Sequence, residues 1–281
     1  MDEELMRTIL HDEHLLLGAV MGEGACGRSV PLSYPVVSAG ERSFGEALLC
    51  DLTGHGSLLL SGASAPSFVS AAFAGRILAV GEVAFEAVLT GDGAVVSIVL
   101  LARTGDAEYA CWDLSGKGDA LHAWLGFLAR VEEGGVRAFP DLALEDAAEA
   151  LVPLLLWGPE ATNVLSDYLG TQLPPAPGTI ANRNLDAIGC LVATLPEVGE
   201  CGYLVLVPPR YARVLWRSFL SFPVVTPMGR RELVFAVSGL FPQLGGDAFV
   251  EGKRAVCPRD ALVEAGLVRA EQTFVGARGL A

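Results

Sequence analysis

Glu200 has the sequence context that could place a single carboxylate inside a ligand site. It lies in the stretch Gly199-Glu200-Cys201-Gly202-Tyr203, close to a glycine on either side. Glycine adopts positive φ without a steric penalty, so this stretch can form a tight turn that directs the carboxylate inward. The alternative is an acid at the tip of a hairpin that points into water, where most glutamates lie. The residue pattern alone leaves both orientations open.

Two other motifs have residues that could do chemistry, but their surroundings argue against it. Residues 22–27 match G-x-G-x-x-G, yet a dinucleotide site needs the last glycine to open a helix, and Pro31 and Pro35 forbid that helix. His11 and His14 are three residues apart, close enough on a helix to share a metal ion. No further ligands stand at a recognisable spacing, so we expect a solvated helix start and no metal.

The remaining histidine and cysteine contexts are typical of structural residues. His55 lies between two glycines with no nucleophile motif nearby, so we interpret it as a loop histidine. The cysteines are scattered and form no C-x-x-C pair, which favours buried, reduced thiols over a disulfide framework or a zinc site. They are Cys26, Cys50, Cys111, Cys190, Cys201 and Cys257.

The composition favours a large core and argues against nucleic-acid and membrane binding. The chain has 281 residues, 52% of them hydrophobic, which is enough for one or two compact domains. Its net charge of −14 comes without the cluster of Lys and Arg that binds a phosphate backbone or an anionic membrane. The acidic start at residues 1–6 lacks the pattern of a secretion signal, and the apolar stretch 95–102 is too short to span a bilayer. We therefore expect a cytoplasmic protein.

The secondary-structure elements that must position any site occur as a repeated pattern in the sequence. Residues 57–73 and residues 153–169, which are 96 positions apart, each read as a short apolar strand, a glycine and a helix. This self-similarity predicts two related units, at about 48–135 and about 148–240. Units that cannot close their own cores normally pack against each other, so we expect a ligand at the seam between them.

Each predicted unit continues with further strands and ends with a helix. For the first unit we expect strands at 83–89, 95–103 and 108–113 and a helix at 119–131. For the second we expect strands at 152–157, 187–193 and 203–207 and helices at 159–169 and 210–220. The connecting segments are expected to form helices at 12–21 and 141–151 and loops at 22–35 and 171–178.

Taken together, these segments resemble the glycine cleavage T-protein (aminomethyltransferase) superfamily of tetrahydrofolate-binding proteins. The resemblance covers nearly the whole chain in the right order, which makes it stronger than any single motif. The similar segments are Leu10–Ala19, the P-x-x-Y turn Pro31–Tyr34, Leu49–Gly56, Gly62–Ala65, Trp157–Ala161, Gly199–Tyr203 and Gln272–Leu280.

The resemblance implies an architecture and a partner. It implies an α+β fold in which two related α/β units with antiparallel sheets pack pseudo-symmetrically around a central folate channel. A single aminomethyltransferase-like folate-binding domain would cover residues 1–281. Family members continue into a C-terminal β-barrel domain, and the chain ends at Ala281 where that barrel would begin. We therefore expect the barrel to be absent and a protein partner to supply the missing wall of the site or the one-carbon donor.

The resemblance also implies residues for the tetrahydrofolate site. Glu200 matches the glutamate that binds the pterin, in the turn G-E-x-G-Y that ends at Tyr203. A carboxylate there would accept paired hydrogen bonds from the 2-amino group and the adjacent ring N–H. Asp113 falls near the family's folate-binding asparagine, Arg231 keeps the first arginine of A-R-D-x-L-R-x-E, and Phe85 replaces an expected tyrosine.

Ser97 stands where the family has its catalytic acid. The segment G-G-x-x-D-D corresponds to residues 93–98, and both of its acids are replaced. A carboxylate there would stabilise a cationic one-carbon centre or move its proton, which a serine hydroxyl does not do at neutral pH. The catalytic group is therefore unknown from the sequence.

Three functions follow from these observations. The first is tetrahydrofolate-dependent transfer of a methyl or aminomethyl group, with the help of a partner subunit. The second is a catalytically inactive folate-binding sensor or assembly module. The third is a scaffold that no longer binds folate. Ser97 and the missing barrel favour the second or a partner-dependent first, whereas Glu200 favours folate contact over none.

Overall fold

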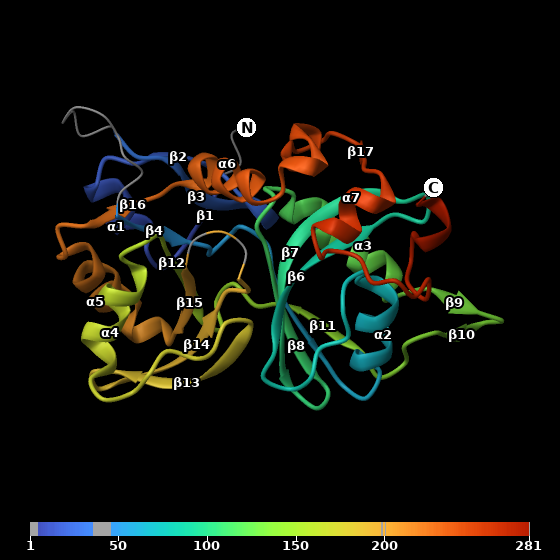
Figure 1. Cartoon of the computed structure of the whole chain (residues 1–281), viewed down its shortest axis with the longest axis horizontal. Coiled ribbons are helices and arrows are strands. Elements are labelled where there is room, and N and C mark those ends of the chain that lie inside the picture. The colour runs from blue at the N-terminus through green and yellow to red at the C-terminus, as the bar shows by residue number, and fades with distance from the viewer. Residues whose placement is uncertain (1–4, 36–45, 198, 200, 281) are drawn as a thin grey trace. The chain divides into compact units, whose positions relative to one another are not determined.

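The chain divides into two units, each made of two separate stretches (Figure 1). The computed structural model describes residues 5–35, 46–197, 199 and 201–280. The first unit comprises Met1–Gly54 and Ala148–Leu233, and the second comprises His55–Ala147 and Val234–Ala281. Glu200 lies outside the described residues, so the inward orientation of its carboxylate stays a prediction.

The second unit is built on an antiparallel sheet in the strand order β11-β5-β8-β7, with both β6 and β17 paired to β7. Its strands are β5 (Ser57–Ser61), β6 (Val83–Leu89), β7 (Ala94–Gly105), β8 (Glu108–Asp113), β11 (Ala143–Asp146) and β17 (Ala255–Val256). Its helices are α2 (Ala65–Ala72), α3 (Gly118–Leu128), α7 (Arg259–Glu264) and the 3-10 turns η2 (Pro242–Leu244), η3 (Gly246–Phe249) and η4 (Ala277–Gly279). A separate hairpin joins β9 (Glu132–Glu133) to β10 (Val136–Arg137).

The first unit is built on a sheet in the order β13-β14-β15-β12-β4-β16, in which only β16 and β4 pair in parallel. Its strands are β4 (Ala47–Asp51), β12 (Val152–Trp157), β13 (Thr179–Leu185), β14 (Ile188–Thr194), β15 (Gly202–Val207) and β16 (Val225–Pro227). A small second sheet holds β1 (Met6–Arg7), β2 (Val20–Glu23) and β3 (Arg28–Ser33), with the 3-10 turn η1 (Ala25–Gly27) between β2 and β3. The helices are α1 (His11–Leu16), α4 (Ala161–Leu169) and α5 (Pro209–Leu220), and α6 (Arg230–Leu240) begins in this unit.

The same order of elements and the same strand pairing recur in both units. In the second unit, β5 is followed by α2, β6, β7, β8 and α3, and β5 pairs with β8, β8 with β7, and β7 with β6. In the first unit, β12 is followed by α4, β13, β14, β15 and α5, and the pairs are β12 with β15, β15 with β14, and β14 with β13. The predicted unit at about 48–135 thus supplies the repeat in the second unit of the structure, and the predicted unit at about 148–240 supplies the repeat in the first unit. The self-similarity of the sequence corresponds to a shared topology.

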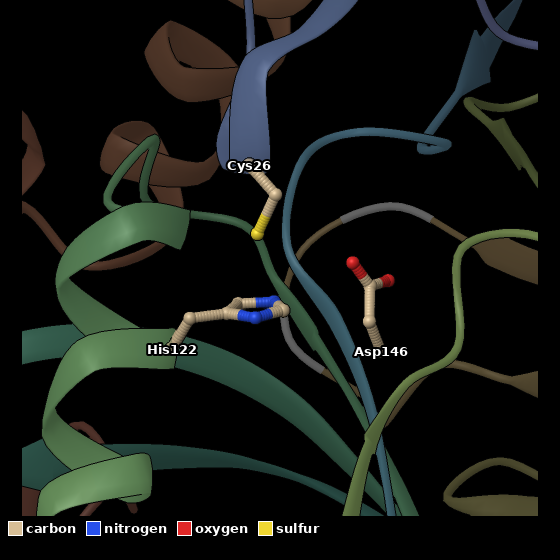
Figure 2. Close-up of side chains that lie close together, drawn as sticks. All are labelled: Cys26, His122 and Asp146. Carbon is tan, nitrogen blue, oxygen red and sulfur yellow. The ribbon is translucent and has the colours of Figure 1, made fainter. Parts of the chain in front are cut away.

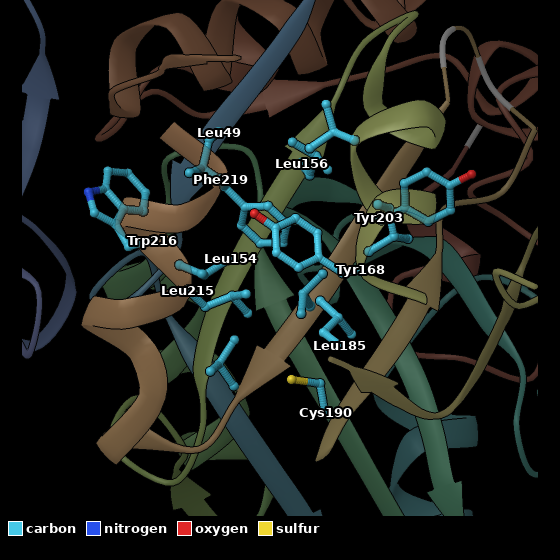
Figure 3. Close-up of a cluster of buried hydrophobic side chains, with 14 of the residues drawn as sticks. Leu49, Leu154, Leu156, Tyr168, Leu185, Cys190, Tyr203, Leu215, Trp216 and Phe219 are labelled. Carbon is cyan, nitrogen blue, oxygen red and sulfur yellow. The ribbon is translucent and has the colours of Figure 1, made fainter. Parts of the chain in front are cut away.

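Helices α4 and α5 cover one face of the sheet in the first unit. Leu154 and Leu156 of β12 are fully buried in a cluster with Trp216 and Phe219 of α5 (Figure 3). The ring of Tyr168 on α4 meets that of Phe219 edge-on at 5.1 Å. Burial of one large apolar side chain contributes roughly 1.5–3 kcal/mol, so this cluster fixes both helices to the sheet.

Helices α2 and α3 cover one face of the sheet in the second unit. Val99 and Leu101 of β7 are buried in a cluster with Phe68 of α2 and with Leu121 and Leu125 of α3. The two α3 residues are four apart, so they lie on one side of the helix. The predicted mixture of helices and antiparallel sheets is therefore confirmed in both units. None of the helices in the described part of the chain has the length and apolarity needed to cross a bilayer.

Three expectations for the connecting segments are wrong. Residues 141–151 contain the edge strand β11 rather than a helix, because pairing of Leu144 with Leu60 completes the edge of the sheet beside β5 and overrides helix propensity. Residues 22–35 contain β3, which tolerates Pro31 because it stands at an irregularity in the pairing with β2. The helix expected at residues 12–21 ends at Leu16, because Val20 and Met21 belong to β2 and pair with β3. In addition, strand β13 was not predicted. The absence of a helix directly after the G-x-G-x-x-G stretch is confirmed.

Candidate functional site

Asp113, at the end of β8, is the centre of a buried hydrogen-bond cluster in the second unit. Its side chain is fully buried, and Oδ1 accepts from Ser97 Oγ at 2.6 Å and from Ser115 Oγ at 2.7 Å. The backbone N–H groups of Ser115 and Lys117 donate to the same carboxyl group at 3.1 and 2.7 Å. Burial raises the pKa of Asp113, and these four hydrogen bonds oppose that rise.

The cluster organises the turn from β8 into α3. A carboxylate accepts hydrogen bonds at both oxygens, and here three donors share Oδ1 while the Lys117 N–H reaches Oδ2. Asp113 therefore anchors the 113–117 turn and the first turn of α3, which is a positioning role. The hydroxyl of Ser97 donates a hydrogen bond to Asp113. Ser97 therefore does not replace the carboxylic acid that the resemblance implies at this position.

Phe85 lies on the opposite face of the same sheet from Asp113. Strand register places Glu86 opposite Val99 and Val99 opposite Asp113, so Glu86 and Asp113 share a face. Successive strand residues point to opposite faces, which puts Phe85 on the other one. There its ring is 5% exposed and lies 5.5 Å from that of Phe241. The structure does not bring Phe85 and Asp113 together.

Tyr203 lies at the start of β15 in the first unit, directly after the turn that contains Glu200. Its ring is buried, and its hydroxyl lies 2.8 Å from Thr162 Oγ1 of α4. Burial raises the pKa of Tyr203, and the hydrogen bond with Thr162 opposes that rise. The phenol stays neutral and holds this end of β15 against α4.

Of the two glycines around Glu200, only Gly199 has the positive φ that the sequence allows, and Gly202 is the first residue of β15. Gly199 has φ of 75°, in the left-handed region that favours glycine. A Cβ on Gly202 would lie 2.6 Å from the side chain of Leu195. Glycine is therefore favoured by backbone conformation at position 199, and at position 202 a larger residue would have to displace the side chain of Leu195. Arg231, the remaining predicted contact in this unit, is exposed on α6.

His14 forms a buried network that the sequence reasoning missed. Its Nε2 lies 3.0 Å from Asp51 Oδ2, and its Nδ1 lies 2.8 Å from the hydroxyl of Tyr34. The imidazole is fully buried and meets Trp216 edge-on at 5.2 Å. The expectation of a solvated helix start is therefore wrong for His14, because both ring nitrogens find partners inside the first unit. The available signal was Asp51, an acid at the end of the apolar strand β4.

Glu86 is a second buried titratable residue that the sequence reasoning missed. One carboxyl oxygen accepts from the backbone N–H of Gly75, and Oε1 has no hydrogen-bond partner among the described residues. Burial raises the pKa of Glu86 to about 8, against the effects of the Gly75 N–H and of Arg269 and Arg76. At neutral pH, Glu86 is therefore mostly protonated in the folded protein.

Figure 2 draws three further residues with titratable side chains. In the second unit, His122 extends from α3, and Asp146 lies at the end of β11 (Figure 2). In the first unit, Cys26 has φ of 56°, which is unusual for a residue with a Cβ. Like the other five cysteines, Cys26 is not in a disulfide. Cys50, Cys111, Cys190 and Cys257 are buried, as expected, whereas Cys26 and Cys201 are exposed.

The fold and the sequence together define the class of protein. Residues 10–230 match the GCVT N-terminal domain family. Because this match covers more than three quarters of the chain, the chain belongs to that family. The predicted relationship is confirmed.

Curated relatives and a solved structure agree with this assignment. An aminomethyltransferase of Streptomyces coelicolor is 28% identical over 228 residues, which is 76% of this chain and 56% of that protein. One from Corynebacterium jeikeium is 23% identical over 316 residues, which is 98% of this chain and 79% of that protein. The chain thus spans little more than half the length of the first of these relatives.

One solved structure similar to this chain is that of the glycine cleavage system aminomethyltransferase T from Bartonella henselae. The two chains superimpose with a TM-score of 0.68 at 21% identity, and the alignment covers 99% of this chain and 74% of the other. At this identity the likeness establishes the fold alone.

Proposed function

We propose that the chain binds tetrahydrofolate and acts in folate-dependent one-carbon transfer. The observation that carries the proposal is the family match across residues 10–230. That range includes Glu200, Tyr203, Asp113 and Phe85, and Arg231 follows it directly. The relatives are named aminomethyltransferases, which supports a methyl or aminomethyl group as the group that this chain would transfer.

Glu200 is the proposed anchor for the pterin. The turn before β15 starts with a glycine at positive φ and ends at a glycine that packs against Leu195. Tyr203 then holds the strand to α4 through Thr162. Binding costs less conformational freedom when the residues next to the carboxylate are already held in place, and a carboxylate that accepts two hydrogen bonds then supports tight binding.

A specific observation favours a second candidate function, an inactive folate-binding module. Ser97 is fully buried, and its hydroxyl donates to Asp113. Asp113 in turn accepts from four donors, so neither group has the exposure of a general acid or base. Catalysis then needs a proton-transfer group from another part of the protein or from a partner subunit.

Calorimetric titration with tetrahydrofolate tests binding, and a turnover assay tests catalysis. We expect saturable heat at ligand concentrations below one millimolar; no heat at millimolar ligand would remove both candidates. The turnover assay uses methylamine-like and methoxy-aromatic donors, each with and without a candidate partner protein. Methylated or aminomethylated folate would support the enzyme, and binding without product under all of these conditions would support the inactive module.

A further inference from the structure

A pocket in the second unit is lined by none of the residues proposed for folate. It has a volume of about 430 Å³ and is open to solvent. Its walls are the start of β7, one side of α3 and the turn at residues 252–254. Pockets of about 300–1,000 Å³ are typical for small-molecule ligands. The size therefore suits one small organic molecule.

Lys117 places a buried positive charge in the wall of this pocket. The residue is 3% exposed, and its Nζ donates to the backbone carbonyls of Asp247 at 3.3 Å and Lys253 at 3.1 Å. An ammonium has three N–H donors, so one is left for a ligand within the described part of the chain. Burial lowers the pKa of Lys117, and the nearby Asp113, Cys257 and Asp247 act in the opposite direction. A ligand anion would complete the hydrogen bonds of this ammonium.

Two more cations lie beside the opening. Lys253 is exposed and lines the pocket together with Arg254. Arg254 pairs with Asp92 through one nitrogen, which leaves the other donors of its guanidinium to other acceptors. Three cations and no acidic residue line this pocket, in a chain with a net charge of −14. This lining favours an anion.

The rest of the lining is apolar except for Thr90 and includes one aromatic ring. Trp124 donates its indole N–H to the carbonyl oxygen of Leu89 at 3.0 Å, which fixes the ring at the pocket wall. Small side chains, among them Ala120 and Ala123 of α3 and Ala94 of β7, leave the space beside it open. A flat apolar group would fill this space without displacing a core residue.

We infer that this pocket binds a small aromatic carboxylate, with the carboxylate toward Lys117 and Lys253 and the ring beside Trp124. The inference does not depend on the proposed folate function, because none of its residues belongs to the folate set. The site would take a substrate or regulator of that chemical class.

Calorimetry with 2-naphthoate, 2-naphthamide and inorganic phosphate tests the chemistry of the site. The amide has the same ring and no charge, so we expect it to bind at least about tenfold more weakly, from the loss of charge-assisted hydrogen bonds. We expect phosphate to bind more weakly than naphthoate, because it leaves the apolar wall uncovered. Equal affinities for the acid and the amide, equal affinities for phosphate and naphthoate, or no naphthoate binding would each overturn the inference.

Two variants locate the site. Lys253→Ala should weaken naphthoate binding about two- to fivefold, the value of an exposed charge pair, and Ala123→Leu should abolish it by filling the pocket. Arg137→Ala is the matched control, because it removes an exposed cation of the same unit that does not line the pocket. Ala123 is exposed, so its substitution leaves the core intact, and circular dichroism checks the fold of each variant. Unchanged naphthoate affinity in folded Ala123→Leu protein would place the ligand elsewhere.

Discussion

Replacement of Glu86 by Gln should change how the free energy of unfolding depends on pH. Burial raises the pKa of this carboxyl group from 4.5 to about 8 in the folded protein. Between these values the folded state keeps a proton that the unfolded state has released. The stability that Glu86 contributes is therefore fully present below pH 4.5 and is lost as the pH rises to about 8.

The size of this effect follows from the difference between the two pKa values. One pKa unit corresponds to about 1.4 kcal/mol, so the loss across the whole window is about 5 kcal/mol. The glutamine side chain of the variant cannot ionise, and its amide oxygen can still accept from the Gly75 N–H. We expect the free energy of unfolding of Glu86→Gln, relative to the native protein, to rise by about 5 kcal/mol across this window.

Urea unfolding at a series of pH values from 4.5 to 8.5 measures this difference. Circular dichroism and tryptophan fluorescence report the transition, and Glu108→Gln is the matched control that removes an exposed carboxylate from β8 of the same unit. Parallel stability curves for the native protein and Glu86→Gln would refute the reasoning, because they would mean that Glu86 binds its proton equally well in the two states.

Three further substitutions test the described networks. Asp113→Asn places an amide N–H₂ among four donors, and we expect a loss of about 2–4 kcal/mol in urea unfolding, larger than that for Ser97→Ala. His14→Ala leaves Asp51 buried without its imidazole partner, and we expect a fall in the thermal midpoint that corresponds to about 3–5 kcal/mol. Gly202→Ala puts a Cβ against Leu195, and we expect a loss of about 1–3 kcal/mol by urea unfolding. A loss below about 0.5 kcal/mol in any of these variants would show that the corresponding contact does not support the fold.

The repeated part of the fold could be predicted because each repeat unit has its own local signals. The apolar runs at 57–61 and 152–157, each followed by a glycine and a helix, correspond to β5 with α2 and β12 with α4. Strand β11 and strand β3 could not be predicted, because neither has a strong pattern of its own. Strand β11 is stabilised by pairing with β5 elsewhere in the chain, and such pairing is not visible in a local window. Strand β3 pairs with the neighbouring β2, but Pro31 within it argues against a strand.

The candidate site was predictable in part. The need for glycine at 199 and 202 followed from the residue types, and the structure gives both glycines a conformational or steric reason. The hydrogen bond between Ser97 and Asp113 could not be predicted, because it depends on the register of β7 and β8. The burial of His14 depends on Tyr34 and Asp51, which are 20 and 37 positions away in the chain.

The dissociation constant of tetrahydrofolate for Glu200→Gln, compared with Glu197→Gln, tests the central claim most directly. Glu197 is an exposed acid just before the same turn, so the pair separates a specific contact from a general change in charge. We expect Glu200→Gln to weaken binding by about 1.5–3 kcal/mol and Glu197→Gln to leave it unchanged. Equal affinity of the native protein and Glu200→Gln would contradict the account, since the pterin would then be held by some other group.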